Sequence, residues 1–182
     1  MTKRHPLSQP AWKEVKAKLA DFDRMGLIGL IHDLYAADKD NQTFLHTRFG
    51  LGKDSLEPYK KTLDRWLSPD VLRNQDVSVA KAKQAISSYR KAIGEPAGLA
   101  ELMVFFCESA AGFCNEFGND DETYFNALVN MFEQAIKVTL QLAAGDRAAL
   151  ISRLDGVRKI SHNLGYGVGD EMDCLLGDHA GI

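Results

Sequence analysis

The sequence predicts an all-α protein built from eight or nine short amphipathic helices. Apolar residues recur at spacings of three and four along nearly the whole chain, and no segment shows a convincing alternation with a period of two. Hydrophobic residues make up 45% and charged residues 26% of the 182 residues, which is the balance of a globular chain. Capping and turn residues interrupt the apolar pattern at short intervals, so we expect short links between successive helices.

Five apolar stripes mark the helices expected in the first half of the chain. The stripes are Trp12, Val15, Leu19 and Phe22; Leu27, Ile28, Ile31, Leu34 and Tyr35; Phe44, Leu45 and Phe49; Leu56, Tyr59, Leu63, Trp66 and Leu67; and Val79, Ala82, Ile86, Tyr89 and Ile93. Pro69 should end the fourth helix, because the residue before a proline avoids the α region. Ser78 should cap the fifth helix, with a loop or short turn over residues 69–77 between the two.

Longer stripes follow in the second half of the chain. They are Leu99, Leu102, Met103, Phe106, Ala110, Phe113, Cys114 and Phe117; Tyr124, Phe125, Leu128, Phe132, Ala135, Ile136, Thr139 and Ala143; Leu150, Ile151, Leu154, Val157, Ser161 and Leu164; and Met172, Leu175 and Leu176. We expect Gly118 to stop the first of these helices and Asp120 to cap the next. Gly145 and Asp146 should form a second stop-and-cap pair.

Length and composition favour a single helical domain over residues 1–182, with residues 1–10 as a flexible N-terminal arm. The helices could form a compact bundle or stacked antiparallel helix pairs. No run of 18 apolar residues is present, and the N-terminus lacks the apolar core of a signal peptide. An odd, low count of three cysteines suits a reducing compartment. We therefore expect a cytoplasmic protein that does not engage a membrane.

Charge is uneven along the chain, although the net charge is only −3. Residues 53–94 carry nine Lys or Arg against five Asp or Glu, a net charge of +4, whereas residues 95–146 carry one Lys against nine acids, a net charge of −8. These halves could complement each other within a monomer or between subunits. The basic helix over 80–93 offers Lys81, Lys83, Arg90 and Lys91 to an anionic partner, but these cations ring its polar arc. Nucleic-acid binding is therefore possible and not favoured.

Arg48 is the cation with the most unusual predicted position. On a helix over 43–49 it projects between Phe44 and Leu45, inside the apolar arc. A buried guanidinium needs a carboxylate, which Asp38 or Asp40 could supply. We expect a structural ion pair there, with a ligand-binding arginine as the alternative.

No recognisable catalytic or metal-binding set is present. Arg158 and His162 lie four residues apart, which differs from the arginine–histidine spacing of helical HEPN-type ribonucleases. The glycine-rich stretch 165–169 follows a helix and lacks nucleotide-binding spacing, so we interpret it as a turn; the alternative is a functional loop with Asp170, Glu171 and Asp173 as its acids. The histidines lack zinc or di-iron spacing, and we predict no metal and no cofactor.

Two stretches carry a resemblance to a known family. They are Leu34–Phe49, beginning Leu-Tyr-Ala-Ala-Asp-Lys-Asp-Asn-Gln, and Ala80–Ile93. Together they resemble a family of small all-helical bacterial proteins of unknown function. The resemblance implies a bacterial cytosolic protein and supplies no activity or catalytic residue. It makes the segments Asp38–Arg48 and Lys81–Lys91 the place to look for a shared surface.

The sequence favours a non-enzymatic protein–protein interaction module, with a scaffold or regulatory role, that forms a homo-oligomer. Abundant amphipathic helix, the uneven charge and the lack of a catalytic set support this hypothesis. A nucleic-acid or phosphorylated-ligand binder that uses the helix 80–93 is the second hypothesis. An enzyme with an unrecognised site is the third.

Overall fold

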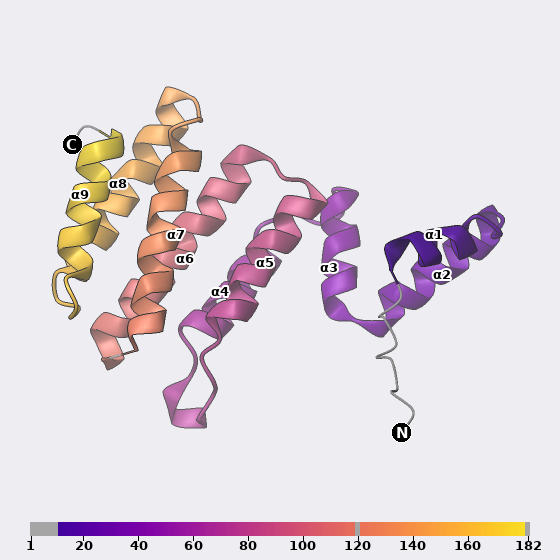
Figure 1. Ribbon diagram of the computed structural model, residues 1–182, viewed down its shortest axis with the longest axis horizontal. Helices are drawn as coiled ribbons and strands as arrows, with labels where there is room; N and C mark the ends of the chain where they lie inside the picture. Colours follow the sequence, from indigo (N-terminus) through magenta and orange to yellow (C-terminus); the bar gives the residue numbers. More distant parts are fainter. Residues whose placement is uncertain (1–10, 119–120, 181–182) are drawn as a thin grey trace, which may run out of the picture. The chain divides into compact units, whose positions relative to one another are not determined.

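The computed structural model describes residues 11–118 and 121–180. The predicted all-α class is confirmed: the described residues form nine α-helices and one short 3₁₀ turn, without a strand (Figure 1). The expected N-terminal arm, residues 1–10, lies outside the described residues. The chain divides into two compact units, of which unit 1 ends at Leu45 and unit 2 begins at His46.

Unit 1 contains α1 (Trp12–Leu19), α2 (Arg24–Ala37) and most of α3 (Lys39–Arg48). The Asp23 side chain caps α2 by accepting a hydrogen bond from the Gly26 backbone N–H at 2.7 Å. Asp38 plays the same part for α3, because its carboxylate accepts from the Asp40 backbone N–H at 2.7 Å. Two aspartate caps therefore set where the second and third helices begin.

Unit 2 contains the remaining elements in successive layers (Figure 1). They are α4 (Glu57–Leu67), η1 (Val71–Arg73), α5 (Val79–Ala92), α6 (Pro96–Phe117), α7 (Glu122–Thr139), α8 (Ala144–Ser161) and α9 (Val168–Ala180). The α4–α5 hairpin packs on α6, which in turn packs on α7 and α8, and α9 closes the far side against α7 and α8. α6 is therefore the central helix of this unit.

The core of unit 2 is centred on α6, where twelve residues are buried. Its apolar stripe belongs to one continuous cluster with the buried faces of α4, α5, α7, α8 and α9, the last of which packs on α7 and α8. Cys107 and Cys114 are both buried there, and Cys114 is a member of the predicted stripe. Among the described residues, α6 is the one helix long and apolar enough to cross a membrane, and 67% of that window is buried, as in the core helix of a soluble protein.

Helix boundaries follow the predicted signals at some positions and not at others. Ser78 caps α5 through its hydroxyl, and Gly118 ends α6 with a φ of 73°, as predicted. Asp121 caps α7, whereas Asp120, the predicted cap, lies outside the described residues. The predicted stop at Gly145 is wrong: α7 already ends at Thr139, and Gly145 lies inside α8.

Two tyrosines join the α4–α5 hairpin to the helices that follow it. The Tyr124 hydroxyl donates to the Leu67 carbonyl at 2.8 Å, which ties α7 to the end of α4. The Tyr89 hydroxyl of α5 lies so close to Gly98 of α6 that a Cβ at position 98 would stand 2.0 Å from it. These contacts fix the hairpin α4–α5 against the central layer.

Candidate functional site

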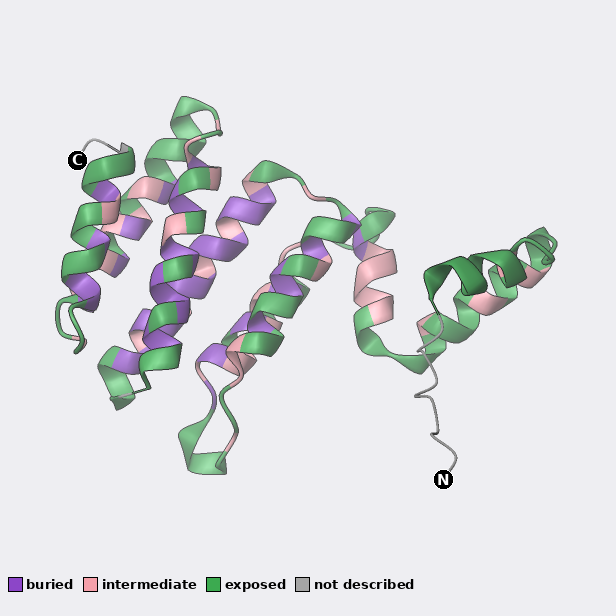
Figure 2. Ribbon diagram, in the orientation of Figure 1, coloured by how far each residue is buried: buried purple, intermediate pink, exposed green. Residues whose placement is uncertain are grey.

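The exposed large apolar side chains of the chain are concentrated on α1, α2 and the link between them. Sixteen large hydrophobic residues are exposed in the described structure, and eight of them fall between residues 12 and 34. They are Trp12, Val15, Phe22, Met25, Leu27, Ile28, Ile31 and Leu34. We call this set the α1–α2 apolar surface. Neither α1 nor α2 contains a buried residue, in contrast to every α-helix of the core of unit 2 (Figure 2).

Four members of the α1–α2 apolar surface form an exposed row on one arc of α2, which we call the outward row. Leu19, Leu30 and Tyr35 are half-buried within unit 1. Leu27, Ile28, Ile31 and Leu34 recur at spacings of one helical turn and remain exposed to between 37% and 53%. The predicted stripes are therefore present on α1 and α2, but most of their members do not enter a core.

A charge network joins three helices in unit 2. Arg153 of α8 donates to both carboxylate oxygens of Glu108 at 2.7 and 2.8 Å, and to Glu101 at 2.5 Å. Lys60 of α4 donates to the other oxygen of Glu101 at 2.6 Å. Burial would raise the pKa of Glu101, but the hydrogen bonds from Arg153 and Lys60 outweigh it and lower that pKa. Each charged group of the network is paired with an opposite charge. We therefore interpret the network as a structural link between α4, α6 and α8.

A cavity of about 320 Å³ lies beside this network. Its lining is Leu56, Ala97, Gly98, Glu101, Leu142, Asp146, Ala149, Leu150 and Arg153. Both oxygens of Glu101 are already bonded, and Arg153 holds two carboxylates. The lowered pKa of Glu101 keeps it ionised at neutral pH, so it does not serve as a proton donor there.

Arg48 takes a different position from the one predicted. Its side chain is exposed, and its guanidinium donates to the Lys91 backbone carbonyl at 3.3 Å, at the C-terminal end of α5. The expectation of a buried guanidinium is therefore wrong, because the apolar arc of α3 is only half-buried at Phe44 and Leu45. The two resemblance segments meet at this bond.

The predicted acidic partners of Arg48 lie in unit 1. Asp38 caps α3, and Asp40 lies in the first turn of that helix. A carboxylate there interacts favourably with the positive end of the helix dipole. These positions give both residues a local role in beginning α3.

The predicted basic side chains are exposed, as a solvated helix face requires. Lys81 lies 3.8 Å from the centre of the Trp66 ring, and Arg65 lies 4.4 Å from the same ring. The Lys81 contact is a cation–π contact between the start of α5 and the end of α4, and the Arg65 contact lies within α4. Lys83, Arg90 and Lys91 are exposed on α5. Lys83 and Arg90 share one flank of the helix because they are two turns apart, whereas Lys81 and Lys91 lie away from that flank. Lys81 and Arg65 therefore contact the same aromatic ring. The four predicted cations of α5 do not lie on one face of that helix.

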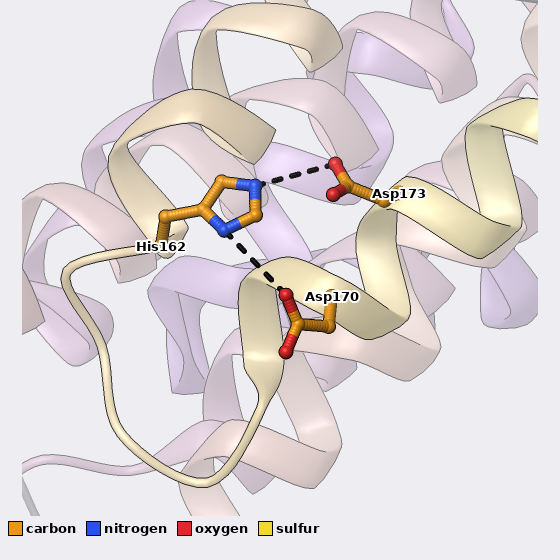
Figure 3. A group of neighbouring side chains, drawn as sticks. All are labelled: His162, Asp170 and Asp173. Carbon is orange, nitrogen blue, oxygen red and sulfur yellow. Dashed lines mark hydrogen bonds and ion pairs between the residues drawn. The ribbon is translucent and has the colours of Figure 1, made fainter.

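A second cluster, which the sequence did not predict, joins α8 to α9. His162, the C-cap of α8, lies between Asp170 and Asp173 on the first two turns of α9 (Figure 3). Its Nε2 is 3.3 Å from Asp173 Oδ1 and its Nδ1 is 3.8 Å from Asp170 Oδ1. Arg158 donates to Asp173 at 2.5 Å and to Asp155 at 2.9 Å, and its hydrogen bond lowers the pKa of Asp173.

The signal for this cluster was partly visible in the sequence. Arg158 and His162 lie one turn apart on a predicted helix, whereas Asp170, Glu171 and Asp173 are the acids of the functional loop considered as the alternative to a turn; the structure places these acids on α9. The turn over 165–167, where Tyr166 and Gly167 adopt positive φ values of 61° and 71°, brings the pairs together. Helical periodicity does not encode such a turn.

Comparison with protein-family models, with curated proteins and with solved structures finds no match for this chain.

Proposed function

We propose that this protein is a non-enzymatic interaction module that associates with a second copy of itself through the α1–α2 apolar surface. The observation that carries the proposal is that eight of the sixteen exposed large apolar residues fall within 23 consecutive positions that contain no buried residue. Contiguous exposed apolar surface of this kind is typical of interaction sites.

The size of the surface supports a stable dimer. A fully exposed large side chain offers roughly 150–250 Å², so eight side chains exposed to between 37% and 70% offer on the order of 800 Å². A standard interface buries about 800 Å² on each partner. Two copies that meet through this surface would therefore bury an area of standard size.

The charge pattern of α2 favours a copy of the same chain as the partner. Among its 14 residues, Arg24 and Asp33 are the Lys, Arg, Asp or Glu types, and the His32 ring lies 3.8 Å from the Asp33 carboxylate. In a two-fold dimer each surface meets itself, so like charges at the contact would repel. The outward row of four aliphatic residues carries no charge and is compatible with self-association.

The experiment is the molar mass of the full chain by light scattering after size exclusion, over a range of protein concentrations. We expect twice the monomer mass of 20.2 kDa for the wild type. Replacing Ile28→Glu together with Ile31→Glu places two charges in the outward row and should give the monomer mass with unchanged helical circular dichroism. Leu72→Glu is the matched control, because Leu72 is a 93% exposed aliphatic residue in unit 2.

Three outcomes would overturn the proposal. A wild type that stays monomeric at all concentrations removes the second copy as partner. A dimer that survives in the double variant and dissociates in Leu72→Glu places the interface elsewhere. A monomer that floats with vesicles of anionic phospholipid would make a lipid surface the occupant of the α1–α2 apolar surface.

A further inference from the structure

The His162 cluster brings three metal-ligating side chains from two helices to one place. One donor atom from each of His162, Asp170 and Asp173 can be chosen so that all three lie within 4.8 Å of one another. His162 comes from the end of α8, and the two aspartates stand one turn apart on the first two turns of α9 (Figure 3). The three side chains converge from opposite sides of a turn.

The imidazole is confined to its position by the backbone of α9. Gly169 is buried beneath it, and a Cβ at position 169 would stand 2.7 Å from the ring atoms Cγ and Nδ1 of His162. The ring therefore packs directly on the first turn of α9, where any side chain would collide with it. This contact holds the imidazole between the two carboxylates.

Arg158 fixes one of those carboxylates. Its guanidinium bridges Asp155 of α8 and Asp173 of α9, with donor–acceptor distances of 2.9 and 2.5 Å. Carboxylates that bind metals are commonly held by such outer hydrogen bonds, which set their orientation. Arg158 and Lys159, which both pair with Asp155, lower the affinity for a cation, whereas the three carboxylates of Asp155, Asp170 and Asp173 outnumber these two positive charges.

We propose that His162, Asp170 and Asp173 bind a divalent transition-metal ion, Zn²⁺ in the first instance, with water as the remaining ligands. One imidazole nitrogen and two carboxylate oxygens are the donor set that suits Zn²⁺ and Mn²⁺. Ligand bonds of about 2.0–2.2 Å separate neighbouring donors by roughly 3–3.5 Å. The donors in this cluster lie up to 4.8 Å apart, so the most distant pair must approach by roughly 1.5 Å, through rotation of the exposed side chains.

Metal binding at this place would join α8 and α9 through a bond outside the core. His162 would use one nitrogen for the ion and keep the other for water, because both carboxylates are proposed as ligands of the ion. The bound ion would therefore cross-link α8 and α9, the last two helices of unit 2. This site shares no residue with the α1–α2 apolar surface.

The test is calorimetric titration of the full chain with ZnCl₂ and, separately, with MnCl₂. The exposed Cys174 is first replaced by serine, so that no thiolate on α9 binds zinc. We expect saturable binding of one ion per chain in the Cys174→Ser protein. The added changes Asp170→Asn and His162→Gln should each weaken binding at least about tenfold.

The controls separate this site from incidental zinc binding. Asp170 has an 85% exposed side chain, so Asp170→Asn leaves packing intact and reports on the ligand alone. His179→Gln, which removes another α9 histidine 3.8 Å from Glu133, should bind as the parent does. Binding that is absent below millimolar zinc, that survives in Asp170→Asn, or that is lost equally in His179→Gln would overturn the proposal.

Discussion

Arg153 donates hydrogen bonds to two carboxylates of α6, those of Glu101 and Glu108. The contribution of Glu101 to the stability of the fold should therefore depend on pH. The pKa of Glu101 is lowered from its ordinary value of 4.5 in the folded chain. A group with a lowered folded-state pKa stabilises the fold above its ordinary pKa and loses that contribution as the pH falls through the lowered value. Glu101 should therefore stabilise the protein at neutral pH and cease to do so in acid.

We expect Glu101→Gln to reduce the free energy of unfolding at neutral pH by about 1–3 kcal/mol, because Arg153 and Lys60 lose a charged partner. The difference from wild type should shrink as the pH falls below 4.5. Urea unfolding over a series of pH values measures both. Glu116→Gln on an exposed position of the same helix is the control, with a change within about 0.5 kcal/mol. A pH-independent difference would contradict the assignment.

Gly98 and Gly112 lie on the same helix in different surroundings. A Cβ at position 98 would meet the Tyr89 hydroxyl at 2.0 Å, whereas a Cβ at position 112 meets nothing within 4 Å. We expect Gly98→Ala to destabilise by about 1–3 kcal/mol through overpacking, despite the better helix propensity of alanine. Gly112→Ala should be neutral or stabilising by up to about 1 kcal/mol. Thermal unfolding of both variants tests the contact, and equal effects would refute it.

At the scale of the element, α7 depends on one side chain for its beginning. The Asp121 carboxylate accepts hydrogen bonds from the backbone N–H groups of Thr123 and Tyr124, the shorter at 2.8 Å. We expect Asp121→Ala to cost about 1 kcal/mol of stability in chemical denaturation. Asp146→Ala is the comparison, because Asp146 stands in the first turn of α8 without capping it, and should cost less. The reverse order would show that α7 begins differently.

The apolar stripes of α6 and α2 are equally clear in the sequence but differ in burial. In α6 the predicted stripe is buried almost throughout, because helices of unit 2 cover it on several sides. In α2 an equally clear stripe is exposed at Leu27, Ile28, Ile31 and Leu34. Spacing identifies which face of a helix is apolar, but it does not identify what packs on that face. That depends on contacts between residues far apart in sequence.

Candidate site residues were less predictable than helices for the same reason. Arg48 was assigned to a buried position from its angle on an isolated helix, whereas its exposed guanidinium binds the end of α5, 43 residues away. His162 and Asp170 are eight residues apart and meet only because the intervening turn contains two positive φ values. Local patterns predicted the start of α5 at Ser78, because a helix cap depends on neighbouring residues. They did not predict contacts between residues that are brought together only by the fold.

At the scale of the whole molecule, self-association couples stability to protein concentration. A ligand or subunit that binds only the folded state raises the unfolding temperature by mass action. We expect the midpoint of thermal unfolding to rise with protein concentration for the wild type. It should be independent of concentration for the Ile28→Glu, Ile31→Glu variant. Because the outward row is uncharged, added salt should not dissociate the dimer. A midpoint that does not change with concentration would argue against association.

The distribution of the three cysteines provides a reporter that requires no engineering. Cys107 and Cys114 are buried in the core, while Cys174 is exposed on α9. A thiol-reactive dye should therefore modify one site rapidly in the native protein and the other two only when unit 2 opens. The slow phase of labelling would measure the opening of the helix core in real time, and the fast phase would mark the outer face of the last helix.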